Sequence, residues 1–180
     1  MKLVLALLTL GGVAYADGYR MGPPPVANPP KACRGDMVWQ DLVGLASTAP
    51  LPTAGTLGEP DGDEHEVHIK FTTDDYYLGL RFYTARADDL DFKKVKAGVE
   101  ARAKKAGWPL KWTRADKTAD GYALVWSETT DPKDKKSGTD YDVLYLRTVG
   151  SSKVVCWNDT SVSPEASKCA AFVCEQIKPQ

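Results

Sequence analysis

The spacing of apolar residues changes twice along this 180-residue chain, and these changes constrain its fold more than any other feature. Over 65–83, apolar and polar residues alternate in two short runs, which predicts a β-hairpin with one buried face. Apolar residues then recur every three or four positions, which predicts an amphipathic helix over 91–106. Alternation returns after Gly107, and a second helical pattern over 164–177 closes the chain.

Four further strands are expected between the two helices, over 108–114, 121–129, 139–148 and 153–157. The runs 122–126 and 143–146 are apolar on both faces, as central strands are. Short connections make neighbouring strands antiparallel. The chain is therefore predicted to form an α+β fold, a mostly antiparallel sheet of about six strands in the order β-β-α-β-β-β-β-α. We expect its helices to pack on one face of that sheet.

The first 16 residues have the pattern of a secretory signal peptide. Lys2 precedes an apolar run over 3–13, and Ala14-Tyr15-Ala16 is a small-x-small cleavage sequence. The apolar run is too short to span a bilayer, so cleavage after Ala16 should release a mature chain. We expect export to a periplasmic or extracellular compartment.

Residues 17–61 are expected to form a proline-rich N-terminal arm before a single α+β domain over 62–180. Prolines concentrate between 23 and 30, and such a run stays extended. A short amphipathic helix is predicted near 36–46, with Asp36 as its N-cap. Prolines and glycines between 50 and 60 then indicate a second irregular segment.

The four cysteines indicate two disulfides, because an exported protein reaches a compartment where disulfides persist. Cys169 and Cys174 are five residues apart on the last predicted helix, about 140° around its axis, so they should not bond to each other. The favoured pairing is Cys33–Cys169 with Cys156–Cys174. The alternative is Cys33–Cys174 with Cys156–Cys169. A zinc site is not expected, since the spacing contains no Cys-x-x-Cys pair.

The sequence leads us to expect no catalytic residue, no cofactor and no metal site. It contains no Gly-x-Ser-x-Gly elbow, and its cysteines should be oxidised. His65 and His68 lie in an acidic stretch that could hold a divalent cation. On a strand, however, these two imidazoles point to opposite faces. A small metal-dependent hydrolase built on this segment is therefore an alternative rather than the first choice.

The charge balance excludes a general nucleic-acid binder, because 23 basic residues face 24 acidic ones. Basic residues do cluster over 93–117. We interpret this cluster as a solvated helix face rather than a docking surface for an acidic partner or an anionic lipid headgroup. No apolar run after the N-terminal one reaches membrane-spanning length.

The aromatic side chains carry the sharpest functional hypothesis. Trp112, Trp126, Tyr141 and Tyr145 lie mainly at alternate strand positions. If the helices cover one face of the sheet, aromatics on the other face could recognise a saccharide, a peptide or a partner protein. The competing interpretation places these rings in the core.

The element order resembles that of the PsbP-like α/β/α proteins, many of which are exported accessory or assembly factors. The resemblance rests on the hairpin at 65–83, the helix at 91–106, the meander at 108–157 and the closing helix, roughly two-thirds of the chain. It implies an accessory or binding role and transfers no functional residue. We therefore expect a non-catalytic, disulfide-stabilised exported binding or accessory protein. The alternatives are a hydrolase around His65 and His68, or a structural envelope or matrix protein.

Overall fold

The computed structural model describes residues 24–42, 44–53, 56–58, 67–73, 76–130, 138–158 and 163–180. Three strands form a smaller sheet: β1 (Met37–Leu42), β2 (Ser47–Pro52) and β10 (Lys178–Pro179). A larger sheet contains β3 (Thr56–Gly58), β4 (Val67–Thr73), β5 (Tyr76–Thr84), β6 (Leu110–Thr118), β7 (Gly121–Thr129), β8 (Thr139–Val149) and β9 (Ser152–Asn158). The helices are α1 (Phe92–Ala106), α2 (Pro164–Glu175) and a short 3-10 helix, η1 (Ala87–Leu90).

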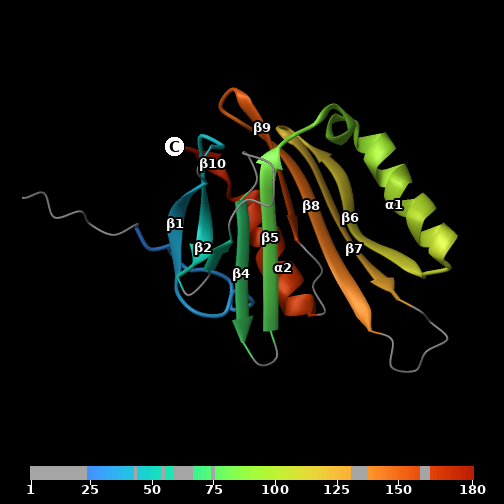
Figure 1. The fold of residues 1–180 in the computed structure, drawn as a ribbon, viewed down its shortest axis with the longest axis horizontal. Helices are drawn as coiled ribbons and strands as arrows, with labels where there is room; N and C mark the ends of the chain where they lie inside the picture. Colours follow the sequence, from blue (N-terminus) through green and yellow to red (C-terminus); the bar gives the residue numbers. More distant parts are fainter. Residues whose placement is uncertain are drawn as a thin grey trace, which may run out of the picture.

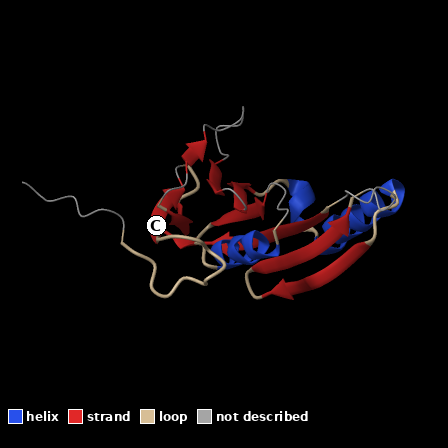
Figure 2. Cartoon of the chain, turned by 90° about the horizontal axis from the view of Figure 1, so that it is seen from below, coloured by secondary structure: helices blue, strands red, loops and turns tan. Residues whose placement is uncertain are grey.

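The larger sheet runs in the order β3-β4-β5-β9-β8-β7-β6, and its strands pair antiparallel throughout. From β4 to α2 the chain follows the predicted order β-β-α-β-β-β-β-α, so the α+β fold is confirmed. The smaller sheet and α1 lie at opposite ends of the molecule (Figure 1, Figure 2).

The two helices pack on opposite faces of the larger sheet, and the expectation of one shared face is wrong. Tyr122 and Leu124 of β7 belong to the core cluster that contacts α1. Ala123, between them, belongs to the cluster that contains the buried residues of α2. Successive side chains of a strand point to opposite faces, so these clusters are the two sides of one sheet, here called the α1 face and the α2 face. The cause lies in the central strands, which are apolar on both sides and need cover on both.

Where the sequence predicted a helix near 36–46, Met37–Leu42 form strand β1 and 44–46 form a turn. β1 pairs antiparallel with β2 along its whole length. Gly44 and Ala46 have φ angles of +84° and +46°, which an α-helix excludes. The apolar residues Met37 and Leu42 are buried in the core on the α2 face. A local helical pattern could not reveal this outcome, because the deciding partner, β2, lies outside it.

β2 itself falls in a stretch that was predicted to be irregular because of its prolines. β10 pairs only with Ser47 and Thr48 at the start of β2. Pro50 and Pro52 therefore lie where β2 has one neighbouring strand rather than two. An edge position tolerates a residue without an N–H group.

Both long helices begin at a residue whose side chain caps them. Asp91 caps α1 by accepting hydrogen bonds from the backbone N–H groups of Lys93 and Lys94. Gly107 ends α1 with a φ of +71°, a conformation that favours glycine. Ser163 caps α2 and Pro164 occupies its first turn.

Two disulfides hold α2 in place. Cys33 is bonded to Cys169, and Cys156 to Cys174, which is the favoured pairing of the sequence and not its alternative. The first bond ties α2 to the segment before β1, and the second ties it to β9. All four cysteines are buried. The helix that covers one face of the sheet is therefore fastened covalently at its middle and at its end.

Some expectations fall outside the part of the chain that is described. These are the signal peptide over 1–16 and its cleavage after Ala16, together with the side chain of His65. His68 lies on β4, at the position paired with Arg81 of β5. Within the described ranges, no helix combines the length and apolar character needed to cross a membrane.

The two disulfides should differ in their effect on stability. Cys33–Cys169 closes a separation of 136 residues and Cys156–Cys174 one of 18. Chain-entropy reasoning assigns the longer loop the larger stabilisation, by about 2 kcal/mol. We expect the double variant Cys33→Ala/Cys169→Ala to lose more free energy of unfolding in urea than Cys156→Ala/Cys174→Ala. An equal or smaller loss for the first variant would contradict this entropic account.

Candidate functional site

A groove of about 490 Å³ lies between α2 and the β6–β8 part of the sheet. Its sheet side includes Val125, Tyr141 and Tyr145. The helix side is one stripe of α2 at spacing i, i+3, i+4, i+7, i+11, made of Pro164, Ser167, Lys168, Ala171 and Glu175. We call this feature the α2 groove.

The α2 groove exists because α2 covers only part of its face of the sheet. The helix contacts β8, β5 and β9. On the other face, α1 contacts β6 and β7. The two helices thus cover different strands on opposite faces of the sheet. The α2 face of β6 and β7 stays open beside α2. Val125 and Tyr141 are half-buried there, so an apolar floor reaches solvent.

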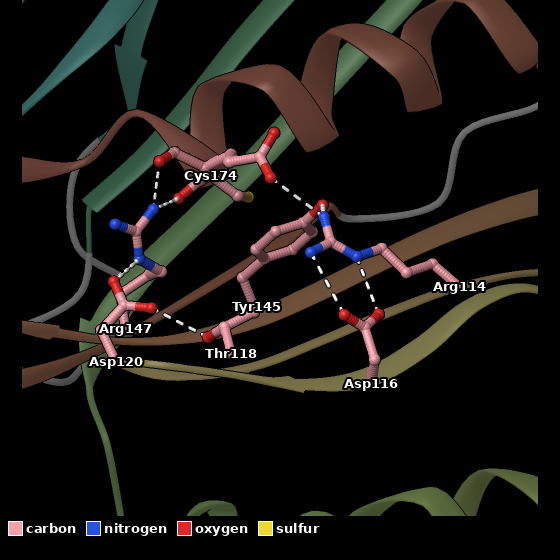
Figure 3. A network of polar contacts seen from close by, with 8 residues as sticks. Arg114, Asp116, Thr118, Asp120, Tyr145, Arg147 and Cys174 are labelled. Atoms are coloured by element: carbon pink, nitrogen blue, oxygen red, sulfur yellow. Dashed lines mark hydrogen bonds and ion pairs between the residues drawn. The ribbon is translucent and has the colours of Figure 1, made fainter.

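One end of the α2 groove is closed by a network around Arg114 (Figure 3). The Arg114 Nε donates to Asp116 Oδ1 at 2.8 Å. Its NH1 group donates to Glu175 Oε1 at 3.0 Å and to the Tyr145 hydroxyl at 3.2 Å. The guanidinium therefore joins β6, β8 and the last turn of α2, and its charge is balanced by two carboxylates.

Arg147 of β8 holds the same turn of α2 from the other side (Figure 3). Its guanidinium pairs with Asp120 and donates to the backbone carbonyl oxygens of Cys174 and Glu175. A cation at this position stabilises the unpaired carbonyl groups at a helix C-terminus. Partial burial alone would raise the pKa of Asp120, but the Thr118 hydrogen bond and Arg147 outweigh it and hold that pKa below its usual value.

The chemistry of the α2 groove is that of a receptor for an apolar group with a polar rim. Tyr145 is almost fully buried, and this burial raises the pKa of its hydroxyl, which stays protonated. Arg114 and Glu175 are both partly exposed and neutralise each other. An apolar side chain of a ligand can thus contact the floor of the groove, while the polar groups next to it on the ligand contact the Arg114–Glu175 ion pair.

The structure separates the four aromatic residues singled out in the sequence. Tyr141 and Tyr145 lie together in the α2 groove. Trp126 borders the groove, but its ring lies on the α1 face, 5.5 Å from the ring of Trp112. The Trp112 Nε1 donates to Glu100 of α1 at 3.2 Å. The two tryptophans therefore anchor α1, and the two tyrosines contribute to the groove.

Sequence reasoning missed the charged residues of the site. Arg114 and Glu175 are separated by 61 positions, and nothing in their local context links them. Lys168 belongs to a helical stripe next to the one expected to face the core. A second partly apolar stripe on α2, through Pro164 and Ala171, was the one available signal that the helix faces a groove.

A second cluster of titratable groups lies on the α1 face, at the far end of β7 and β8. Glu128 is 2% exposed, and its Oε1 accepts from the Trp126 Nε1 at 2.7 Å and pairs with Arg102. Burial, followed by the charge of Glu128, raises the pKa of Asp142 to about 7. The same two causes raise the pKa of Asp140. In the described ranges no group of side chains is arranged to hold a metal ion.

Comparison with known proteins assigns no family to this chain. No protein-family model matches it, and no curated protein matches it. Its function is therefore inferred from the groove, the residues that fix α2 and the charges around them.

The buried acid on β8 predicts a pH-dependent stability. The pKa of Asp142 is about 7 in the folded chain and about 4 in an unfolded one. The folded state thus binds the extra proton between these values, and its stability falls as pH rises from about 4 to 7, by at most about 1.4 kcal/mol per pH unit. Asp142→Asn removes this titration. Its free energy of unfolding should exceed that of the wild type increasingly from pH 4 to pH 8.

Chemical denaturation at several pH values measures this difference directly. Asp41→Asn, at an exposed aspartate of β1, controls for the substitution itself. A difference between Asp142→Asn and the wild type that is the same at pH 4 and pH 8 would refute the assignment of the titrating group.

Proposed function

We propose that this chain is a non-catalytic, exported binding domain whose α2 groove receives an apolar segment of a partner protein. One observation carries the proposal: an apolar floor reaches solvent beside a helix that two disulfides and two arginines hold in place. A receptor that is already ordered avoids the entropy cost of ordering on binding.

The surface of the α2 groove favours a protein segment over a saccharide. Sugar recognition on aromatic residues uses an open ring face, but Tyr145 is 3% exposed and Arg114 lies 5.7 Å from its ring centroid. The half-buried ring of Tyr141 shares the floor with the aliphatic Val125, and Ala171 forms part of the wall. A mostly apolar pocket with a polar rim is typical of a site that receives one buried side chain at a protein interface.

The rim of the α2 groove gives such a partner its orientation. Lys168 is exposed along the helix side, and the half-exposed pair of Arg114 and Glu175 closes one end. A segment that presents one apolar side chain can hydrogen-bond to these groups at both sides. Rim charges of this kind mainly set the association rate and the direction of binding rather than the affinity.

Export and an accessory role are supported by features outside the groove. Two buried disulfides persist in an oxidising compartment, which agrees with the signal peptide expected over 1–16. The accessory role rests on the resemblance to PsbP-like proteins that the sequence suggested. The hydrolase alternative depends on His65 and His68, whose side chains lie outside the described part of the chain.

Filling the α2 groove should abolish partner binding. Ala171→Arg places a long charged side chain against the floor, and Ala101→Arg adds the same side chain to an exposed position of α1. A photo-crosslinking amino acid at position 168 should give a discrete adduct in the native compartment, and the same amino acid at position 104 should not. Ala171→Arg should remove this adduct, and Ala101→Arg should leave it.

Two results would overturn the proposal. One is the same set of adducts from positions 168 and 104, which would mean that contact with other proteins is unspecific. The other is an adduct at 168 that survives Ala171→Arg while thermal melting confirms that the variant is folded.

A further inference from the structure

A cavity of about 570 Å³ lies on the α1 face, opposite to the α2 groove. It opens where η1 and the first turn of α1 approach the ends of β6–β9. Its lining combines apolar side chains with two lysines: Leu90, Phe92, Tyr122, Leu146, Lys117 and Lys153.

Apolar carbon reaches solvent at the mouth of this cavity rather than at its floor, because Tyr122 and Leu146 are only 1% and 4% exposed. Leu90 is 44% exposed, and within the described ranges it is the one large apolar side chain with such exposure. The rings of Phe92 and Tyr122 lie 5.7 Å apart. The Tyr122 hydroxyl donates to the backbone oxygen of Asp89 at 2.7 Å, so its polar end is occupied. Leu90 and the half-buried Phe92 thus offer a small apolar contact surface at the mouth of the cavity.

The free charges at the cavity are positive. Its two acidic residues are already engaged, Asp91 by the backbone N–H groups that it caps and Asp120 by Thr118 and Arg147. Lys117 and Lys153 are exposed, and neither has an ion-pair partner among the described residues. The first turn of α1 cannot itself take an anion, because Asp91 occupies its N–H groups.

The strand register places the two lysines on either side of the apolar floor. Lys117 of β6 is paired with Tyr122 of β7, and Lys153 of β9 is paired with Thr148 of β8. The register aligns Lys117 with Val155, two residues from Lys153, so the two lysine backbones are three strand spacings and two residues apart, about 16 Å. Lysine side chains are long enough to reach inward over apolar surface and keep the ammonium group in water.

We infer that this cavity binds a small organic anion with an apolar body, such as an aliphatic or aromatic carboxylate. The apolar part covers Leu90 and Phe92, and the carboxylate pairs with Lys117 or Lys153. Inorganic anions cannot make the apolar contact, and neutral apolar molecules cannot pair with a lysine. Among the described residues, this cavity and the α2 groove share no lining residue, so this inference does not depend on the proposed binding function.

Titration calorimetry of the purified protein with octanoate, octanol and acetate tests both the apolar contact and the contact between the carboxylate and lysine. Octanoate should bind at least tenfold more tightly than octanol or acetate. Lys117→Gln/Lys153→Gln should weaken octanoate binding about tenfold or more. The matched control Lys93→Gln/Lys104→Gln removes two exposed lysines of α1 and should leave the affinity unchanged. Leu90→Ser should weaken octanoate binding without affecting acetate.

Amide chemical shifts locate the bound molecule. Octanoate should shift the resonances of Gly121 and Thr148, which line the cavity, and leave those of Ala171 and Ser167 in the α2 groove in place. Equal affinity for octanoate and octanol, or an unchanged affinity in the folded Lys117→Gln/Lys153→Gln variant, would overturn the inference. Shifts confined to the α2 groove would overturn it as well.

Discussion

The structure depends on a sheet whose central strands are apolar on both faces. Leu124 and Leu146 on one side and Ala123 and Val143 on the other are nearly inaccessible to water. Exposure of either set would cost about 25 cal/mol for each Å² of apolar surface. One helix cannot cover two faces, so α1 and α2 take one each. Because the two helices lie over different strands, the α2 face of β6 and β7 stays open beside α2, and the α2 groove lies there.

The position of α2 links the stability of the chain to its proposed function. The helix supplies buried side chains to the core and a wall to the α2 groove, so any shift of α2 changes both. Two disulfides restrain it, and Arg114 and Arg147 hold its last turn against the sheet. The network in Figure 3 therefore fixes the last turn of α2 relative to the sheet. A groove held in this way selects ligands by shape, because it cannot relax around a poor fit.

Local periodicity was sufficient wherever neighbouring residues decide the structure. The 3.6-residue pattern of α1 and its Asp91 and Gly107 ends are local features, and the angle between Cys169 and Cys174 on one helix excluded one of three disulfide pairings. Prediction failed where a distant partner decides. β1 is a strand because β2 pairs with it, and Arg114 meets Glu175 through tertiary packing. Helix sidedness also escaped prediction, since a strand that is apolar on both faces does not say which helix covers which.

The two sites should act independently, for reasons that lie in the sheet between them. The α2 groove and the α1-face cavity are lined by alternate residues of the same strands, Tyr145 and Leu146 being neighbours on β8. Coupling between sites needs an element with two arrangements that both ligands favour unequally. A strand in the middle of a seven-stranded antiparallel sheet, hydrogen-bonded on both sides, offers no second register, because a one-residue slip would exchange its two faces. α2 is held by its disulfides. Among the described residues α1 carries no covalent tie, and its main contacts are with β6, β7 and η1. A ligand in the cavity would meet η1 and the first turn of α1, and the described lining of the cavity includes no residue of α2.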